Sequence, residues 1–446
     1  MIPPRAPEAE PQGLIHSSVA LFLCAWIVGM AQSFPLGKFG FGHGFEMAAI
    51  ARNLADHGTF GNPFGIATGP TAVVPPLYPL FLAAMIKIFG DVLPAAQVAN
   101  IAANALTAAF LPALARAFYS DARPGLFAGA LWILAMPVMP QWDVSFTVAL
   151  ETIGCFFIFK TTSRAGRAGC EAAGCGVIAG LTSLLNPVTF LIFGTWAGFR
   201  LLSLRAAVKD ALRYMSILVV AATLCNVPWL VRNYRIWHAP VLRTNFGMTV
   251  YSSNNDCAQS SLFKDGANGC YQTTHPIASE SEARLLQKMG EIEYDRRRTA
   301  DAWNWIRSHG ARFRQLTLER MVEFWFPDPT PAPRQVYAVW AITLLSIPGI
   351  ALMARTRSRG LWFVLLVWLA YPLVYYIAVS ADRYRYPILW TSLLPAGYSL
   401  AAVWPADRLL TWFRCFQAQV KPLRISPGYG ANSDARQPDA NRTQGF

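Results

Sequence analysis

The sequence predicts an all-α membrane protein with about ten transmembrane helices, and its composition and apolar runs carry that prediction. Of the 446 residues, 54% are hydrophobic and only 14% are charged, whereas about 25% of the residues of a soluble domain are charged. The apolar residues gather in runs long enough to span a membrane, at 15–35, 95–117, 124–141, 144–160, 173–187, 188–202, 212–231, 336–354, 361–379 and 387–404.

Basic residues between these runs predict the orientation of the chain. Breaks rich in Lys and Arg are expected on the cytoplasmic side, and four occur, at 116–123, 164–167, 205–213 and 355–359. All four reach that side only if the segment 74–90 does not cross the membrane. That segment is about 17 residues long and contains Pro75, Pro76, Pro79 and Lys87. We therefore expect a shallow interfacial or re-entrant helix there.

This topology predicts four parts of the chain. An N-terminal transmembrane module at 1–231 contains a first outer loop at 36–94, and an extracytoplasmic domain follows at 232–335. C-terminal transmembrane helices occupy 336–404, and a cytoplasmic tail occupies 405–446. The tail is expected to be partly disordered, because beyond its first part it is rich in Gly, Pro, Asn, Ser and Asp.

The extracytoplasmic domain is the place where a small water-soluble fold can form. It begins with a turn-rich stretch at 244–255 and has a helical pattern of dense mixed charge at 279–305. Cys257 and Cys270 lie between the two. In an oxidising compartment they could close a disulfide loop that stabilises the fold by about 3 kcal/mol. Two free thiols are the alternative.

Composition and motifs argue against several function classes. The net charge of +13 does not indicate nucleic-acid binding, because the basic residues lie in short loops without interleaved aromatic residues. The Gly-rich stretch at 40–44 does not match G-x-G-x-x-G, since residue 45 is Phe. P-loop, zinc-protease and D-x-D patterns do not occur, and the Cys and His residues form no zinc motif. No cleavable signal peptide is expected, because the first apolar run is too long and lacks an A-x-A site.

Glu46 is the most informative polar residue. It follows the first apolar run at the head of a short amphipathic helix, so it is expected at the membrane surface, where a carboxylate is a candidate for function. The helical period places Asn53 on the same face. A carboxylate fixed near a dry site can act as a general base. The alternative is a surface helix whose Glu46 faces water.

Other polar residues are predicted on the same outer face. Asp143 precedes an apolar run, where it could be functional or could cap the helix. Arg383 and Arg385 flank Tyr384 between two outer span ends, and paired guanidinium groups suit a lipid phosphate. Snorkelling to lipid headgroups is their alternative role. Two arginines on the outer face oppose the positive-inside bias, which favours function.

Weaker candidates complete the set of substrate-binding residues. Arg232 and Asn233 end the seventh span, where a plain stop-transfer flank explains them equally well. Lys87 could reach a phosphate or only snorkel. The first outer loop adds Arg52, Asn53 and Tyr78.

Several short stretches, read in order, resemble one known superfamily. They are GFEMAAIARNLADHG at 44–58, TGPTAVVPPLYPL at 68–80, Trp142-Asp143, Asn186-Pro187, PWLVRNY at 228–234 running to 253–255, and RYRYP at 383–387. Together they resemble the polyprenyl-phosphate-dependent glycosyltransferases with the GT-C fold. That superfamily includes the dolichyl-phosphate-mannose protein mannosyltransferases and the lipid A aminoarabinose transferases, and the likeness is closest to its bacterial branch.

The resemblance implies roles for the candidate residues. It implies that Glu46 is the catalytic acid or base, that Asp143 is a second acidic position, and that Arg383 and Arg385 contact the donor phosphate. Many relatives carry an acidic pair at the first position, where this chain has Phe45-Glu46. Some also carry a Lys before the first-loop proline, where this chain has Val. These departures leave a divalent metal cofactor and the detail of phosphate binding open.

The expected activity is transfer of a glycosyl group from a polyprenyl-phosphate-linked sugar to a protein, lipid or glycan acceptor. Its expected place is the periplasmic side of a bacterial inner membrane, with membrane lipids as further partners. One alternative is a non-enzymatic flippase or transporter of lipid-linked saccharides. The few ionisable residues in the predicted spans argue against it. A scaffold that recruits envelope partners is the other alternative.

Overall fold

The computed structural model describes residues 11–404, with gaps at 34–44, 91–92, 138, 140–141, 163–167, 205–207 and 359. Within this part the elements are helices, and the only β-type pairings are the isolated bridges Gly61–Pro70 and Ser261–Ser380. The all-α prediction is thereby confirmed for the described residues. Those up to Val403 belong to one compact unit. The predicted tail at 405–446 lies outside the described residues.

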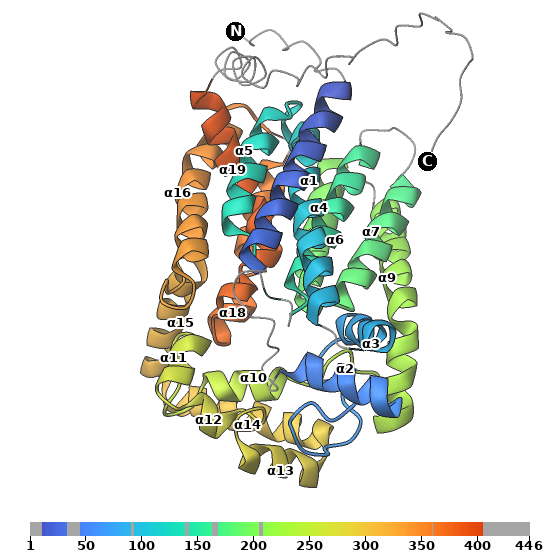
Figure 1. Ribbon diagram of the computed structural model, residues 1–446, viewed down its shortest axis with the longest axis vertical. Coiled ribbons are helices and arrows are strands. Elements are labelled where there is room, and N and C mark those ends of the chain that lie inside the picture. The colour runs from blue at the N-terminus through green and yellow to red at the C-terminus, as the bar shows by residue number, and fades with distance from the viewer. Residues whose placement is uncertain are drawn as a thin grey trace, which may run out of the picture. The chain divides into compact units, whose positions relative to one another are not determined.

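A helix stands at each of the predicted spans. These helices run along the vertical direction of Figure 1 and are α1 (Pro11–Ser33), α4 (Leu93–Tyr119), α5 (Arg123–Ala135), α6 (Val144–Thr162), α7 (Ala168–Ser183), α8 (Phe190–Leu204), α9 (Val208–Trp237), α16 (Pro333–Arg355), α17 (Leu361–Ala370) with α18 (Leu373–Ile377), and α19 (Tyr386–Val403). Among the described residues, α1, α4, α9 and α16 are long and apolar enough to cross a membrane. The protein is thus a multi-pass membrane protein, while the count of ten crossings stays a prediction.

Prolines explain where the helices depart from the predicted spans. The span predicted at 361–379 is divided into α17 and α18, because Pro372 lacks an N–H and clashes with the preceding turn. The span predicted at 124–141 ends already at Ala135. Met136 has an extended ψ of 137°, which is the conformation that the following Pro137 imposes on its neighbour.

Glycines let the long helices approach one another closely. A Cβ atom at Gly176 of α7 would lie 2.3 Å from the carbonyl oxygen of Leu218 in α9. At Gly349 of α16 it would lie 2.0 Å from the carbonyl oxygen of Pro395 in α19. Backbone atoms cannot yield to such a clash, so a side chain at either position would force the helices apart. Small residues at helix crossings are typical of membrane bundles.

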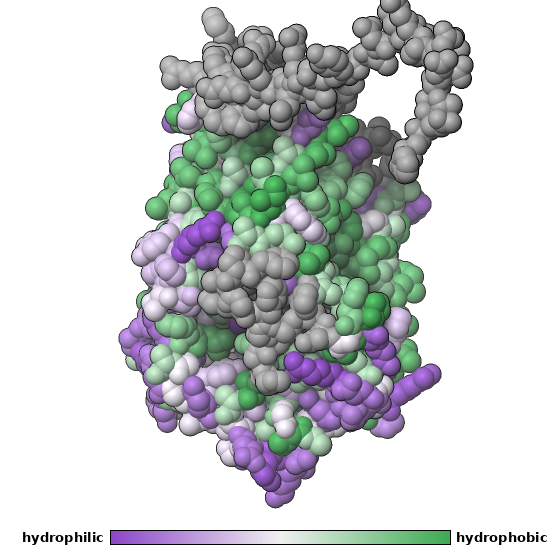
Figure 2. Space-filling view, viewed as in Figure 1, coloured by the Kyte–Doolittle hydropathy of each residue, from purple (hydrophilic) through white to green (hydrophobic). Residues whose placement is uncertain are grey.

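The remaining helices gather at one end of the long ones (Figure 1). They are α2 (Glu46–His57), α3 (Leu77–Phe89), α10 (Phe246–Ser253), α11 (Leu262–Ala267), α12 (Tyr271–Thr274), α13 (Glu280–Met289), α14 (Glu291–Ser308) and α15 (Gly310–Trp325). Figure 1 shows α3 end-on, across the direction of the long helices, as the predicted interfacial helix requires. In Figure 2 the long helices present mostly hydrophobic residues, whereas hydrophilic residues gather over this end.

The segment predicted as an extracytoplasmic domain is helical over most of its length. The helical pattern at 279–305 corresponds to α13 and α14, which Gly290 separates at a φ of 79°. The turn-rich prediction for 244–255 is wrong, because α10 packs on α14 and buries Met248 and Val250. Such tertiary contacts override local preference. Cys257 and Cys270 form a disulfide.

Candidate active site

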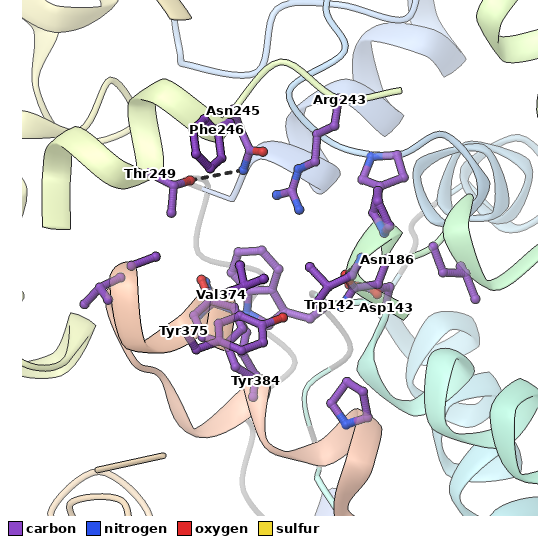
Figure 3. Close-up of a pocket in the computed structure, with 18 of the residues that line it drawn as sticks. Trp142, Asp143, Asn186, Arg243, Asn245, Phe246, Thr249, Val374, Tyr375 and Tyr384 are labelled. Carbon is purple, nitrogen blue, oxygen red and sulfur yellow. Dashed lines mark hydrogen bonds between the residues drawn. The ribbon is translucent and has the colours of Figure 1, made fainter. Parts of the chain in front are cut away.

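A cavity of about 300 Å³ lies between the long helices and the helices gathered at their end, and both groups line it (Figure 3). Its hydrocarbon walls come mainly from α10, α18 and the turn before η1 (Pro187–Thr189). The polar residues that line it are Asp143, Asn186, Arg243, Asn245, Thr249, Tyr375, Arg383 and Tyr384. A mostly apolar cavity with a few convergent polar groups is typical of a small-molecule site.

Asp143 lies directly before α6 and is only 8% exposed. Its Oδ2 accepts a hydrogen bond of 2.9 Å from the hydroxyl of Thr147, one turn further along the helix. Burial raises the pKa of the Asp143 carboxyl, and this hydrogen bond and the charges of Arg243 and Arg383 oppose the shift. Asp143 therefore stands at the start of the helix and also lines the cavity.

Arg383 belongs to the short 3₁₀ helix η2 (Asp382–Tyr384) and lines the cavity. Its guanidinium carbon lies 4.0 Å from the ring centroid of Trp142 and 4.8 Å from that of Tyr384. Tyr384 in turn stacks on Tyr375, with ring centroids 4.6 Å apart. Two aromatic rings thus contact one half-buried cation, and Tyr375 supports one of them. In Figure 3, Tyr384 and Tyr375 lie beside Trp142 on one side of the cavity.

Arg243 is a site residue that the sequence interpretation missed. It follows α9 and α10 follows it, and Figure 3 shows its side chain pointing toward the cavity. Its Nε donates a hydrogen bond of 2.7 Å to the carbonyl oxygen of Val73 in the first outer loop. Burial lowers the pKa of Arg243, and Asp143 and Glu46 are among the groups that raise it again. The sequence did contain a signal for this residue. Arg243 lies in a segment predicted on the outer face, where an arginine opposes the positive-inside bias.

Glu46 is the first residue of α2 and is 7% exposed, so the alternative of a water-facing surface helix is wrong. The next residue, Met47, lines the cavity. Burial raises the pKa of the Glu46 carboxyl, and its own backbone N–H, Arg383 and Arg243 oppose the shift. Both candidate acids therefore interact with the same two arginines.

Arg385 lies away from the cavity that Arg383 lines. It is 1% exposed, its guanidinium carbon lies 4.2 Å from the ring centroid of Trp325, and its Nη2 donates to the Ser392 hydroxyl at 2.6 Å. The helical geometry explains the separation, because residues two positions apart in a helical turn point in different directions. Its Nε and Nη1 have no hydrogen-bond partner among the described residues, so a contact with phosphate stays a prediction.

Arg232 and Asn233 have structural partners outside the cavity. Arg232 donates hydrogen bonds to the carbonyl oxygens of Thr71 at 2.7 Å and Phe60 at 2.8 Å, which attaches the first outer loop to α9. The Asn233 amide donates to the carbonyl oxygen of Val241 at 2.7 Å. These contacts favour a role in holding the fold.

The first-loop candidates are not among the residues that line the cavity. Asn53 donates to the carbonyl and hydroxyl oxygens of Thr59 and braces its own loop. The Tyr78 hydroxyl is buried and accepts a hydrogen bond of 2.8 Å from Asn100. Arg52 is half-buried on α2, and Lys87 is exposed on α3.

A metal ion has no evident ligand set in the described part of the chain, since no three His, Cys, Asp or Glu side chains converge there. Among the residues that line the cavity, Asp143 is the acid, and Glu46 directly precedes the lining residue Met47. A divalent metal cofactor stays open, and no step below runs through one.

The arrangement of the helices is similar to that of a solved membrane oligosaccharyltransferase. A structure of the oligosaccharyltransferase AglB from Archaeoglobus fulgidus, in complex with an inhibitory peptide and a dolichol-phosphate, matches 92% of this chain with a TM-score of 0.50 and 12% identity. The chain spans about half of that protein, 52% of its length. The likeness therefore concerns the fold.

Two further solved structures are less similar. An Archaeoglobus fulgidus oligosaccharyltransferase in complex with Zn and sulfate has a TM-score of 0.48 and 13% identity, over 89% of this chain and 51% of its own. ArnT from Cupriavidus metallidurans, bound to undecaprenyl phosphate, has a TM-score of 0.40 and 14% identity, over 88% of this chain and 78% of its own. The sequence matches no protein-family model and no curated protein.

Proposed function

We propose that this protein transfers a glycosyl group from a polyprenyl-phosphate-linked sugar to an acceptor at the extracytoplasmic face of an inner membrane. One observation carries the proposal: Asp143, Arg243 and Arg383 line one cavity at the end of the long helices, and Glu46 directly precedes Met47, which also lines it. Arginines bind phosphate and a carboxylate accepts a proton. The similarity of the fold to AglB, whose solved structure is a complex with a dolichol-phosphate, supports the proposal.

In the proposed reaction the acceptor hydroxyl attacks the anomeric carbon of the donor sugar. Its proton passes to the Glu46 carboxylate, and the bond between the anomeric carbon and the phosphate oxygen breaks. Negative charge then develops on the leaving lipid phosphate, which Arg243 and Arg383 stabilise. Donors that are fixed in advance in a water-poor site give the largest stabilisation of this kind. The products are the glycosylated acceptor and the lipid phosphate.

Glu46 is better suited than Asp143 to take the proton. Asp143 already accepts a hydrogen bond from Thr147 of its own helix, so one of its carboxyl oxygens is bound. In the ligand-free structure no side chain of the described residues donates a hydrogen bond to Glu46, and His275 Nε2 lies 3.9 Å from its Oε1. Asp143 then balances the charge of the two arginines that line the cavity.

The test uses the full-length protein in lipid nanodiscs, with radiolabelled undecaprenyl-phosphate mannose, glucose and aminoarabinose as donors and envelope extract as the source of acceptor. Glu46→Gln and Arg243→Ala should each reduce label transfer by about 10²–10³-fold. Matched controls are Glu293→Gln and Arg296→Ala, an exposed pair 2.7 Å apart on α14, which should leave transfer unchanged.

The binding step has its own measurement. Native mass spectrometry should detect undecaprenyl phosphate on the wild type and much less on Arg243→Ala, while undecaprenol, which lacks the phosphate, should bind both equally. Full transfer and full binding in the Glu46 and Arg243 variants would refute the roles given to these residues, and absence of transfer by the wild type would refute the function.

A carrier for lipid-linked saccharides is the second candidate, and Glu151 favours it. This acid is fully buried in α6, and both of its carboxyl oxygens have no hydrogen-bond partner among the described residues. An ionisable residue at such a depth is a candidate for a transport pathway. The two functions are distinguished by the product, because a carrier moves the labelled donor across the membrane without forming a new glycosidic bond.

A further inference from the structure

His275 lies next to the proposed base and was not a candidate from the sequence. It directly follows α12 and is buried, 9% exposed. Its ring stacks on Tyr271, with centroids 4.7 Å apart, and meets the edge of Phe64 at 6.5 Å. Two aromatic rings therefore fix the plane of the imidazole. The disulfide at Cys270 precedes α12 and ties this segment to Cys257.

The hydrogen bonds of His275 select one tautomer of its ring. The backbone N–H of Ile277 donates to His275 Nδ1 at 3.2 Å, so Nδ1 carries the lone pair and a neutral ring carries its proton on Nε2. Burial, with the nearby charge of Arg383, lowers the pKa of His275 to about 3. The ring is thus neutral at physiological pH, and its N–H is on Nε2.

That nitrogen faces the carboxylate of Glu46. The distance from His275 Nε2 to Glu46 Oε1 is 3.9 Å, about 1 Å longer than a hydrogen bond. Hydrogen bonds of catalytic groups are often long in ligand-free proteins and shorten when substrate binds. The other groups that interact with Glu46 are Arg243, Arg383 and Tyr271.

We propose that His275 is a positioning residue, which presents a neutral Nε2–H to the Glu46 carboxylate and holds that carboxylate ionised and oriented for proton transfer. This inference rests on the proposed function, since it assigns the partner of the proposed base. A neutral donor suits the task because it stabilises the carboxylate without offering a proton of its own. An imidazolium beside Glu46 would instead compete with the acceptor hydroxyl as the proton source.

The first test measures Glu46 directly and needs no substrate. Infrared difference spectra of the nanodisc protein are recorded during a pH titration, and the carboxylic-acid band of Glu46 is identified by its loss in Glu46→Gln. His275→Phe keeps the ring between Tyr271 and Phe64 but removes the N–H. It should move the midpoint of this band upward by about one pH unit, the effect of losing one hydrogen bond to a charged group.

Two variants control the measurement. His275→Gln supplies an amide N–H at similar reach without the ring, and it should return the midpoint most of the way to the wild-type value. His309→Phe is the matched control, because His309 stacks on Trp305 at 4.9 Å but is exposed and lies between α14 and α15, away from Glu46 on α2 in the sequence. It should leave the midpoint where it is.

The same variants then enter the transfer assay. In His275→Phe the acidic limb of the rate–pH profile should move to higher pH by the same amount as the infrared midpoint. In His275→Gln this limb should move back toward its wild-type position. An unmoved infrared midpoint in a folded His275→Phe protein would overturn the inference. If His275→Phe does not fold, a midpoint that is the same in His275→Gln and in the shorter His275→Asn overturns it instead. Absence of label transfer by the wild type would refute the proposed function while leaving the infrared result in place.

Discussion

Replacing Arg232 by Ala should weaken the fold while leaving the chemistry largely intact. Its guanidinium donates to the carbonyl oxygens of Thr71 and Phe60 and to the Asn233 side chain, at 2.7 to 2.8 Å. It also lies 4.8 Å from the ring centroid of Trp229. Hydrogen bonds from a charged group contribute about 1.5–3 kcal/mol each. Because the side chain is half-buried, the lower value applies to the two carbonyl bonds.

The expected cost is therefore about 3 kcal/mol of unfolding free energy, with a further contribution of about 0.5–1 kcal/mol from the aromatic contact. The assay is thermal denaturation of the detergent-solubilised protein followed by tryptophan fluorescence, paired with transfer kinetics well below both midpoints. Arg232→Ala should lower the midpoint by several degrees and change kcat and KM less than threefold. Arg383→Ala should instead reduce the rate of transfer strongly and change the thermal midpoint little, because Arg383 lines the cavity. Lost transfer at an unchanged midpoint in Arg232→Ala would refute this reasoning and restore Arg232 as a substrate ligand.

Three further outcomes are expected. The rate of transfer should rise as the pH rises through the titration of Glu46, because burial raises its pKa and only the ionised carboxylate accepts a proton; a rate–pH profile that falls over this range contradicts the assignment. Replacing both Cys257 and Cys270 by Ser should lower the unfolding free energy by about 3 kcal/mol, the effect expected for a loop of this size. Reduction should destabilise the wild type equally and have no effect on the double variant, as thermal midpoints with and without reductant will measure. Glu151→Met should raise the thermal midpoint, because its two buried carboxyl oxygens have no partner in the described residues and a lone buried polar group costs about 1–3 kcal/mol; a lower midpoint would reveal a partner, and a loss of donor movement would favour the carrier.

The apolar runs located the long helices because a membrane-spanning helix must be apolar for about 20 residues, and few other patterns satisfy that condition. Their ends were less predictable. The division between α17 and α18 lies at Pro372, inside an apolar run that hydropathy alone reads as continuous. The short α10 was predicted as turns because its local sequence contains Asn and Ser, and burial against α14 decides otherwise.

For the site, the sequence identified individual candidate residues but not which of them lie close together in space. Asp143 and Arg383 line the cavity and Glu46 lies beside it, and all three were candidates. Arg243 and His275 were missed, since each stands alone in an irregular stretch without a recognisable motif. Their importance comes from what packs around them, which no local pattern records.

The sequence by itself determined the class of structure, because the need to satisfy backbone hydrogen bonds in lipid leaves helices as the natural form of long apolar runs. It also identified an acid near the beginning of the chain and an arginine near its end as candidates. Only the tertiary structure decided that Glu46 and Arg383 interact, while Arg385 lies apart and Arg232 holds a loop. The physical reason is that burial and charge pairing depend on contacts between segments far apart in the chain, and side chains that are neighbours in sequence can point to different surroundings.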